Sequence, residues 1–430
     1  MNSADALATG LALPFAGTSS FAAIQAAWRF YHNDAITLPV LAKPLQELAC
    51  QSAQDACGAW VVVALDWSYL HYEHHPGKSD RMALRHQNNQ GYKLLTALAL
   101  SDTTGTPLAP VCLELQSACG LYSTRSGKLL RAESPLDGLT PVMQHVQALP
   151  WSKPVVFVID READSVGHYR RWAGQGWRFV VRADKERLVE HQGRERSLDY
   201  VAARVPLRRV GAATCKDQPC QWYLGQDSVV LSRPAREHRV KPAGKRRKAR
   251  HRNVPGARLP LRLIVSELRD ASGKVLARWL LLSNAPPEVP ARTVAQWYLF
   301  RWQIENYHKL LKRGGLKLES WLQENAAALS KRLLIGAMAV ALAWQLAADP
   351  SPNAANLRQL LVRLSGRQIK RGKGRPTFTI PALVAGLGVF LPALDLLEHH
   401  TPEELRTLAK ATGLPRFNSP TPRTTPQGFA

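Results

Sequence analysis

Two continuous apolar runs constrain the fold of this chain more than any other feature. Residues 60–65 read WVVVAL and residues 155–159 read VVFVI, and Asp66 and Asp160 follow them directly. Short runs of β-branched and apolar residues are typical of strands that are buried on both faces of a sheet. We therefore expect two buried strands that end by delivering a carboxylate each to the rim of one sheet.

The rest of the sequence predicts an α/β chain that is interrupted by a β-rich stretch over about residues 186–290. Between about 186 and 290, short β-like runs such as LPLRLIVSEL and ARWLLLSN replace the earlier alternation of strands and helices. The other predicted elements are helices over most of 1–55, strands over 92–100 and 107–115, a helix over 165–173, a strand over 177–182, and helices from about 292 to 365.

The charge of the chain points to a polyanionic partner. It carries 57 Lys and Arg against 33 Asp and Glu, a net charge of +24, for which nucleic acid is the best match. Residues 233–252 hold ten of these cations and one acid. We expect this basic loop to contact DNA through its central cluster, with a merely solvated loop as the alternative. The cluster consists of Lys245, Arg246, Arg247 and Lys248.

Cysteine use and hydropathy indicate a cytoplasmic protein. The six cysteines show no CxxC spacing, which favours reduced thiols over disulfides or a zinc site. No basic stretch precedes the weakly apolar N-terminus, so we expect no signal peptide. The apolar run at 333–348 is short for a membrane span and predicts a buried helix. The HYEHH cluster at 71–75 lacks the spacing of a zinc motif.

The segment WYLFRWQIENYHKLLK, residues 297–312, has the periodicity of a helix with one charged face. At about 100° per residue, five side chains fall within an arc of roughly 80°, opposite a mainly apolar side. They are Tyr298, Arg301, Glu305, Lys309 and Lys312. We expect one helix over 292–313, ended by Gly314 and Gly315. The alternative is an ordinary amphipathic helix on which Glu305 pairs with Lys309 in solvent.

Asp66, Asp160 and Glu305 can meet if this helix lies against the sheet rim. Three hard oxygen ligands suit Mg²⁺ or Mn²⁺ and leave coordination sites for water and phosphate. Two such ions can activate a nucleophile and stabilise a leaving oxygen in phosphodiester chemistry. Each aspartate alone can instead be a turn or cap residue. Glu73 and Asp80 are poorer candidates because neither closes an apolar run.

Two motifs resemble those of a known family. The spacing Y-(2)-R-(3)-E-(6)-K, complete from Tyr298 to Lys312, resembles the signature of IS4 family transposases, and DREADS at 160–165 resembles the Tn5-like branch of that family. The resemblance covers about residues 20–350. It implies an RNase H-like catalytic core, a mixed sheet flanked by helices, over 56–185 and 291–350. A β-rich insertion over 186–290 would interrupt it, with helical parts at 1–55 and 351–430.

The resemblance also implies roles for single residues. Asp66, Asp160 and Glu305 would be the DDE triad and hold two Mg²⁺ ions, for which Mn²⁺ can substitute. Trp279 would stack on a base flipped out of the transposon end, with a core tryptophan as the alternative. The phosphates near the cleavage point would be bound by Tyr298, Arg301, Lys309 and Lys312.

The function implied is DNA transposition. The protein would bind the terminal inverted repeats of its insertion sequence as a homodimer formed through 351–430, cleave them through hairpin ends and join them to target DNA. The alternatives are a metal-dependent endonuclease without strand transfer and a degenerate copy that only binds DNA. The N-terminal helical DNA-binding region is shorter than in relatives, so the copy is either truncated or recognises its ends through other parts.

Overall fold

A computed structural model describes residues 20–84, 89–130, 134–215, 218–238, 251–366 and 378–411. The chain forms two compact units, one of residues 33–345 and one of residues 1–32 and 346–430. The basic cluster from Lys245 to Lys248 lies outside the described residues, so its role stays a prediction.

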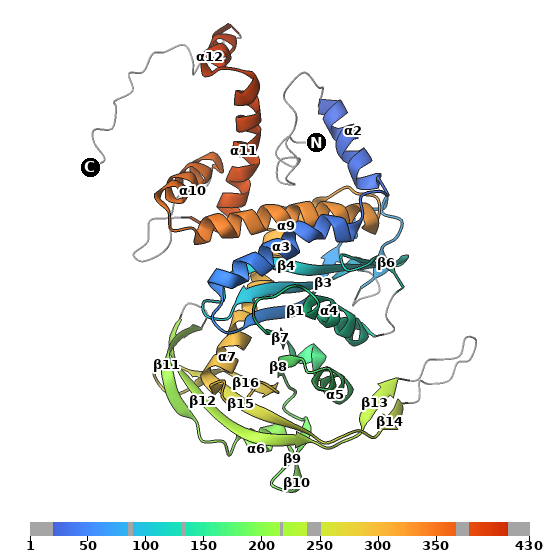
Figure 1. Cartoon of the computed structure of the whole chain (residues 1–430), viewed down its shortest axis with the longest axis vertical. Coiled ribbons are helices and arrows are strands. Elements are labelled where there is room, and N and C mark those ends of the chain that lie inside the picture. The colour runs from blue at the N-terminus through green and yellow to red at the C-terminus, as the bar shows by residue number, and fades with distance from the viewer. Residues whose placement is uncertain are drawn as a thin grey trace, which may run out of the picture. The chain divides into compact units, whose positions relative to one another are not determined.

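The larger unit is built on one mixed sheet (Figure 1). Its strands follow the order β10-β9-β12-β15-β16-β8-β7-β1-β3-β4-β5-β6, with β11 beside β12 and β2 beside β3. At its centre, β1 (Val61–His71), β7 (Val155–Ile159) and β8 (Arg178–Arg182) run parallel to one another. One half of the sheet is completed by β2 (Met82–Ala83), β3 (Gln90–Ser101), β4 (Pro107–Ser117), β5 (Gly120–Ser123) and β6 (Gly127–Leu129).

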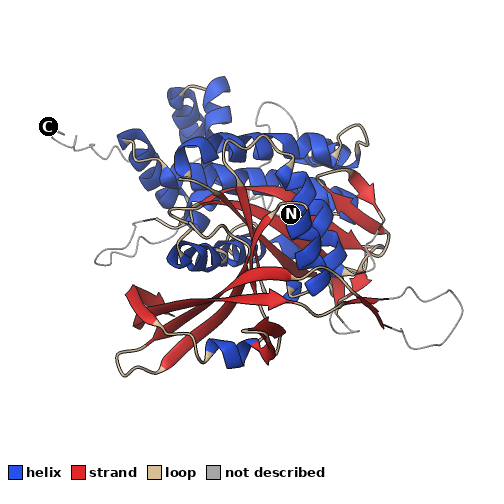
Figure 2. Ribbon diagram, turned by 60° about the horizontal axis from the view of Figure 1, so that its bottom comes forward, coloured by secondary structure: helices blue, strands red, loops and turns tan. Residues whose placement is uncertain are grey.

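Helices flank this sheet (Figure 2), as the predicted fold class requires. The helix α3 (Leu38–Ala56) packs mainly on β4, whereas α7 (Ala291–Phe300) contacts β7, β8, β12 and β15. The remaining helices of the unit are α4 (Leu139–Gln147), α5 (Val166–Gly174), α6 (Leu198–Ala202), α8 (Trp302–Lys312) and α9 (Ala326–Ala348), with short 3₁₀ turns η1 (Pro135–Gly138), η2 (Arg161–Ala163) and η3 (Leu318–Ser320). In keeping with this cover, the residues 61–65 of β1, all of β7 and the residues 179–181 of β8 are apolar and buried.

The two predicted apolar strands are present, but the first runs further than expected. Asp160 follows the last residue of β7, as predicted. Asp66, by contrast, does not close β1, which continues to His71. The reason is that β1 outruns its parallel neighbour: its pairing with β7 ends at Leu65, opposite Ile159, while its pairing with β3 continues to His71. Asp66 therefore lies where the parallel part of the sheet ends.

The single helix predicted over 292–313 is wrong, because the chain forms two helices that meet at Arg301. At this junction Arg301 N donates to Tyr298 O at 3.2 Å, and Ile304 N donates to Arg301 O at 3.0 Å. These are the shorter-range bonds of a 3₁₀ turn, which winds the chain more tightly than an α-helix. The second helix, α8, ends at Lys312, shortly before the predicted stop at Gly314.

The stretch over 186–290 forms strands as expected, and they join the central sheet. β16 (Val275–Ser283) pairs with β8 through Leu281 opposite Arg182 and Ser283 opposite Val180. The other strands of this stretch are β9 (Leu188–His191), β10 (Arg194–Ser197), β11 (Arg208–Cys215), β12 (Gln218–Leu231) and β15 (Leu259–Arg269), beside a separate ribbon of β13 (Ala235–His238) and β14 (His251–Val254).

The smaller unit is helical over its described residues. It contains α2 (Ser20–His32), α10 (Pro352–Leu364), α11 (Ile380–His399) and α12 (Pro402–Ala411). α10 packs closely on α11 because Gly386 has no side chain: a Cβ there would lie 2.2 Å from Leu361 O.

Two described helices, α9 and α11, are long and apolar enough to cross a membrane. The most apolar stretch of α9 is 72% buried within the protein, as in a core helix and as predicted for residues 333–348. The corresponding stretch of α11 is 35% buried. Length and apolar composition do not by themselves distinguish a core helix from a membrane span, so they place neither helix in a bilayer.

Candidate active site

One guanidinium joins the three carboxylates that the sequence singled out. Arg301 Nη1 lies 3.4 Å from Oδ2 of Asp66, and Nη2 lies 3.4 Å from Oδ2 of Asp160 and 2.9 Å from Oε1 of Glu305. The three acids come from β1, from the residue after β7 and from the first turn of α8. Arg301 is only 6% exposed, so the cluster is formed inside the protein.

Local structure fixes the two aspartates. Asp160 caps the 3₁₀ turn η2, accepting a hydrogen bond from Arg161 N at 2.7 Å. Its Oδ1 also accepts the hydroxyl hydrogen of Tyr298 at 3.0 Å and lies 3.6 Å from Arg182 Nη1. Asp66 accepts a hydrogen bond from Trp67 N at 2.9 Å. Asp160 is thus the more richly hydrogen-bonded of the two carboxylates.

This difference separates the pKa values of the two acids. Burial raises the pKa of Asp66 to about 6, and the nearby Arg301 offsets only part of that effect. Burial also acts on Asp160, but there Arg301, Arg161 N, Tyr298 and Arg182 outweigh it and the pKa falls below its ordinary value. Near neutral pH, Asp66 is therefore the carboxylate closest to its titration midpoint.

The donor set suits a divalent cation. Across the described ranges, no three Asp, Glu, His or Cys side chains already stand as a cluster that could hold a metal ion. Asp66, Asp160 and Glu305 instead surround the positive charge of Arg301. Mg²⁺ and Mn²⁺ prefer oxygen ligands such as carboxylates. The three acids already direct such oxygens towards one positive charge. By donor type, the three residues fit such an ion.

The predicted phosphate-binding stripe is divided by the structure. Tyr298 and Arg301 contact the carboxylates. Lys312 instead donates to the backbone carbonyl of Tyr69 and lies 3.8 Å from Glu319. Lys309 lies over the ring of Trp302, 4.8 Å from its centroid. Only Tyr298 and Arg301 of these cationic or polar residues are thus brought to the acids.

Trp279 lies next to this cluster. It is half-buried on β16, and its ring centroid is 6.4 Å from that of Tyr298. The residue is therefore neither fully in the core nor remote from the acids.

The two acids that the sequence made poorer candidates, Asp80 and Glu73, have partners elsewhere. Asp80 accepts hydrogen bonds from Tyr92 and from Ala326 N at the start of α9, and Glu73 pairs with His71.

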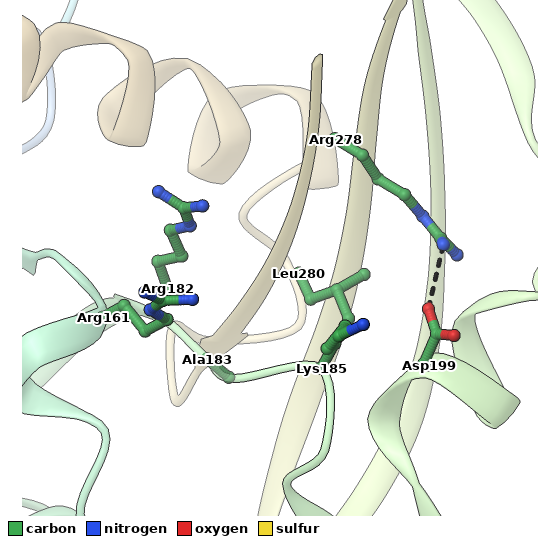
Figure 3. A pocket seen from close by; sticks show the side chains of 7 residues that line it. All are labelled: Arg161, Arg182, Ala183, Lys185, Asp199, Arg278 and Leu280. Atoms are coloured by element: carbon green, nitrogen blue, oxygen red, sulfur yellow. Dashed lines mark hydrogen bonds and ion pairs between the residues drawn. The ribbon is translucent and has the colours of Figure 1, made fainter.

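Sequence reasoning missed a pocket beside Asp160 that is rich in cations (Figure 3). It has a volume of about 220 Å³ and is lined by Arg161, Arg182, Ala183, Lys185, Asp199, Arg278 and Leu280. Arg278 pairs with Asp199 at 3.0 Å across it. Arg161 stands within DREADS and Arg278 precedes Trp279, which were the available signals.

Comparison with protein families identifies the domain that holds these residues. Residues 61–342 match the family model of the transposase DDE domain. The chain belongs to this family. The match begins at the first residue of β1 and ends within α9, so this transposase domain contains all three acids, Arg301, Trp279 and the pocket. A search of curated proteins found no match. DDE transposases in general depend on divalent metal ions, and they act on DNA.

Proposed function

We propose that this DDE transposase is of the IS4 type, in its Tn5-like branch, and mobilises its own insertion sequence. It binds the terminal inverted repeats, cleaves them and transfers the ends to target DNA. The observation that carries the proposal is the convergence of Asp66, Asp160 and Glu305 on one buried point within a transposase domain. The Y-(2)-R-(3)-E-(6)-K spacing and DREADS support the branch.

The three acids would hold the metal, as one or two Mg²⁺ or Mn²⁺ ions. When bound, such ions supply an activated nucleophile and stabilise the leaving oxygen of a phosphodiester. Tyr298 orients the Asp160 carboxylate by its hydrogen bond. The partial burial of the three acids, 21–31% exposed around the buried Arg301, strengthens their charge interactions.

The surroundings support a DNA substrate. The pocket beside Asp160 offers Arg161, Arg182 and Lys185 to backbone phosphates. Trp279 would stack on an extruded base during a hairpin step, which its half-buried position 6.4 Å from the ring of Tyr298 supports. Lys309, Lys312 and the cluster Lys245, Arg246, Arg247 and Lys248 would add phosphate contacts, in keeping with the net charge of +24.

The remaining parts complete the proposal. The catalytic domain comprises 56–185 and 291–350, the insertion 186–290, and the N-terminal DNA-binding region 1–55. Residues 351–430 serve a homodimer on DNA. The protein works in the cytoplasm at the nucleoid. An endonuclease without strand transfer and a copy that only binds DNA are the two competing functions.

Incubation with DNA that carries the native ends, with and without Mg²⁺, separates these functions. A transposase cleaves the ends and joins them to a second DNA, an endonuclease only cleaves, and a decayed copy only binds. Asp160→Asn and Glu305→Gln should abolish cleavage while binding persists, because many separate contacts hold the DNA. Asp270→Asn is the matched control, since Asp270 accepts hydrogen bonds from Ser272 and Lys274 in the turn between β15 and β16 and belongs to neither the acid cluster nor the pocket. Cleavage by either triad variant would remove that residue from the site.

A further inference from the structure

Arg301 occupies the one point at which all three acids converge. Its two terminal nitrogens lie 2.9–3.4 Å from Asp66, Asp160 and Glu305. We propose that Arg301 is a positioning residue that takes the place of the metal in the metal-free protein and must leave that place when a divalent cation binds. The inference rests on the proposed function, which assigns these acids to the metal.

The first argument is charge. Three carboxylates held close together repel one another strongly when they are partly removed from water, unless a cation stands among them. Each is more than half buried, with side-chain exposures of 21% for Asp66, 31% for Asp160 and 28% for Glu305. The guanidinium supplies the opposing charge and so keeps the acids gathered before any metal arrives.

The second argument is exclusion. A divalent cation that bound the same oxygens would lie within a few ångströms of the guanidinium, and two positive charges at that distance repel. The cation and the guanidinium therefore compete for the acids. Competition of this kind lowers the affinity of the metal-free site for its ion by the free energy of the Arg301 contacts.

The third argument is that the contacts of Arg301 are incomplete. Two of its three ion pairs are 3.4 Å long, against about 2.7–2.9 Å for a well-formed charged hydrogen bond. Its Nε is buried without a hydrogen-bond partner among the described residues. A phosphate can accept two parallel hydrogen bonds from a guanidinium, including one from Nε. For a displaced Arg301, a DNA phosphate is therefore a better hydrogen-bond partner than the three acids, in keeping with the phosphate contact expected of this residue from the sequence.

The place for such a phosphate adjoins the acids. Arg182 lies 3.6 Å from Asp160 and also lines the cation-rich pocket of Figure 3. Arg301 itself stands at the junction of α7 and α8, with Tyr298 5.6 Å from its guanidinium carbon. A displaced Arg301 side chain would turn from the acids towards the pocket, which Arg182 links to Asp160.

Mn²⁺ binding to the full-length, DNA-free protein tests the inference, measured by titration calorimetry and by the loss of the free Mn²⁺ signal in electron paramagnetic resonance. We expect Arg301→Gln to bind Mn²⁺ about tenfold more tightly than the wild type, because a competing charge has gone. A residue that merely supported the fold would weaken binding when replaced. Arg125→Gln is the matched control: it removes an arginine, 19% exposed, that pairs with the buried Glu114 at 2.7 Å, and it should leave Mn²⁺ affinity unchanged.

Unchanged or weaker Mn²⁺ binding by a folded Arg301→Gln protein overturns the inference. Should that variant fail to fold, Arg301→Lys decides, because lysine keeps the charge on a single nitrogen, whereas Arg301 reaches the three acids with two. It should bind Mn²⁺ about two- to threefold more tightly than the wild type, and no gain overturns the inference. Asp160→Asn distinguishes the two proposals. If Mn²⁺ binding to the wild type does not depend on Asp160, the metal assignment and the proposed function fail together; if it does, only the role of Arg301 is at stake.

Discussion

The hydroxyl of Tyr298 donates a hydrogen bond to Oδ1 of Asp160 at 3.0 Å, across 138 residues of sequence. Tyr298 is 5% exposed, and its hydroxyl is directed to the carboxylate in this structure. A carboxylate that accepts a hydrogen bond in its ionised form is held in one orientation and is easier to keep ionised. Tyr298 and Arg301 therefore fix the same acid from two sides.

Tyr298→Phe should slow cleavage about tenfold and change DNA affinity by less than about twofold, because it removes one bond to the acid and no contact to a phosphate. The stability loss should be about 1 kcal/mol. Cleavage kinetics and a gel-shift titration measure the two effects. Tyr200→Phe is the control, since Tyr200 stacks under Arg204 away from the acids. Parallel loss of binding and cleavage would instead make Tyr298 a phosphate ligand.

Trp279→Ala should impair hairpin formation or opening more than first-strand nicking. A hairpin strains the DNA, and a base stacked on the indole offsets about 1–3 kcal/mol. Trp279→Phe keeps a stacking face and should restore part of the activity. A time course that resolves nicked, hairpin and blunt ends makes the comparison. Equal loss at every step, with a drop in melting temperature, would make Trp279 a residue of the fold only.

The candidate acids were predictable in part from sequence: Asp160 and Glu305 stand in recognisable motifs, whereas Asp66 lies within β1 and closes no strand. The apolar runs identified β1 and β7, and residues 160–165 marked Asp160. The break at Arg301 was not predictable. The helical periodicity is unbroken over 292–313 and so predicts one helix. It cannot show that the Arg301 guanidinium, in the middle of this segment, contacts acids from other parts of the fold.

The pocket shows the second limit of sequence reasoning. Its cations come from residues 161, 182, 185 and 278, so only the pairing of β8 with β16 brings them together. The charged stripe shows a third limit. A helical projection shows which side chains share a face, but it cannot show that Arg301 meets carboxylates while Lys312 meets the backbone of β1.

DNA affinity should fall steeply with salt, since many phosphate contacts release counterions. Neutralising Lys245, Arg246, Arg247 and Lys248 together to Gln should flatten the slope of log affinity against log salt by up to about 3.6, at about 0.9 per lost contact. Fluorescence anisotropy at several salt concentrations measures it. The control neutralises Lys43 and Lys274, both exposed in the structure. An equal slope in wild type and variant would exclude the loop from binding.

The metal-free protein should lose stability as pH rises from about 4 to 6. Asp66 has a folded pKa of about 6 against an ordinary value of 3.8, so within this window the folded chain holds a proton that the unfolded chain has released. Urea unfolding at pH 4, 5, 6 and 7 in EDTA should show this fall, and Asp66→Asn should reduce it. The pH dependence that Asp160 contributes to the free energy of unfolding has the opposite sign. Its pKa is lowered, so its stabilising contribution is lost only as pH falls below 3.8, and Asp160→Asn should remove that loss. A fall of the same size in Asp66→Asn would contradict the assignment.

Gly105→Ala should destabilise the protein by about 2–6 kcal/mol. Gly105 has φ of +71°, and a Cβ there would lie 2.3 Å from Cδ1 of Phe300, the residue before Arg301. Backbone strain and overpacking each cost about 1–3 kcal/mol. Gly127→Ala is the matched control, with φ of +79° and nothing within 4 Å of its Cβ. Equal losses in thermal denaturation would show that Phe300 yields freely.

Because β16 is hydrogen-bonded to β8, and β8 to β7, Trp279 and Asp160 are carried by three adjoining strands of a single sheet. The distance between the Trp279 indole and the Asp160 carboxylate is then fixed by the separation and register of these strands. The connections between β8 and β16 can lengthen or shorten in evolution without altering that spacing. If Trp279 and Asp160 have the roles proposed for them, the sheet itself fixes the distance from the stacked base to the cleaved bond.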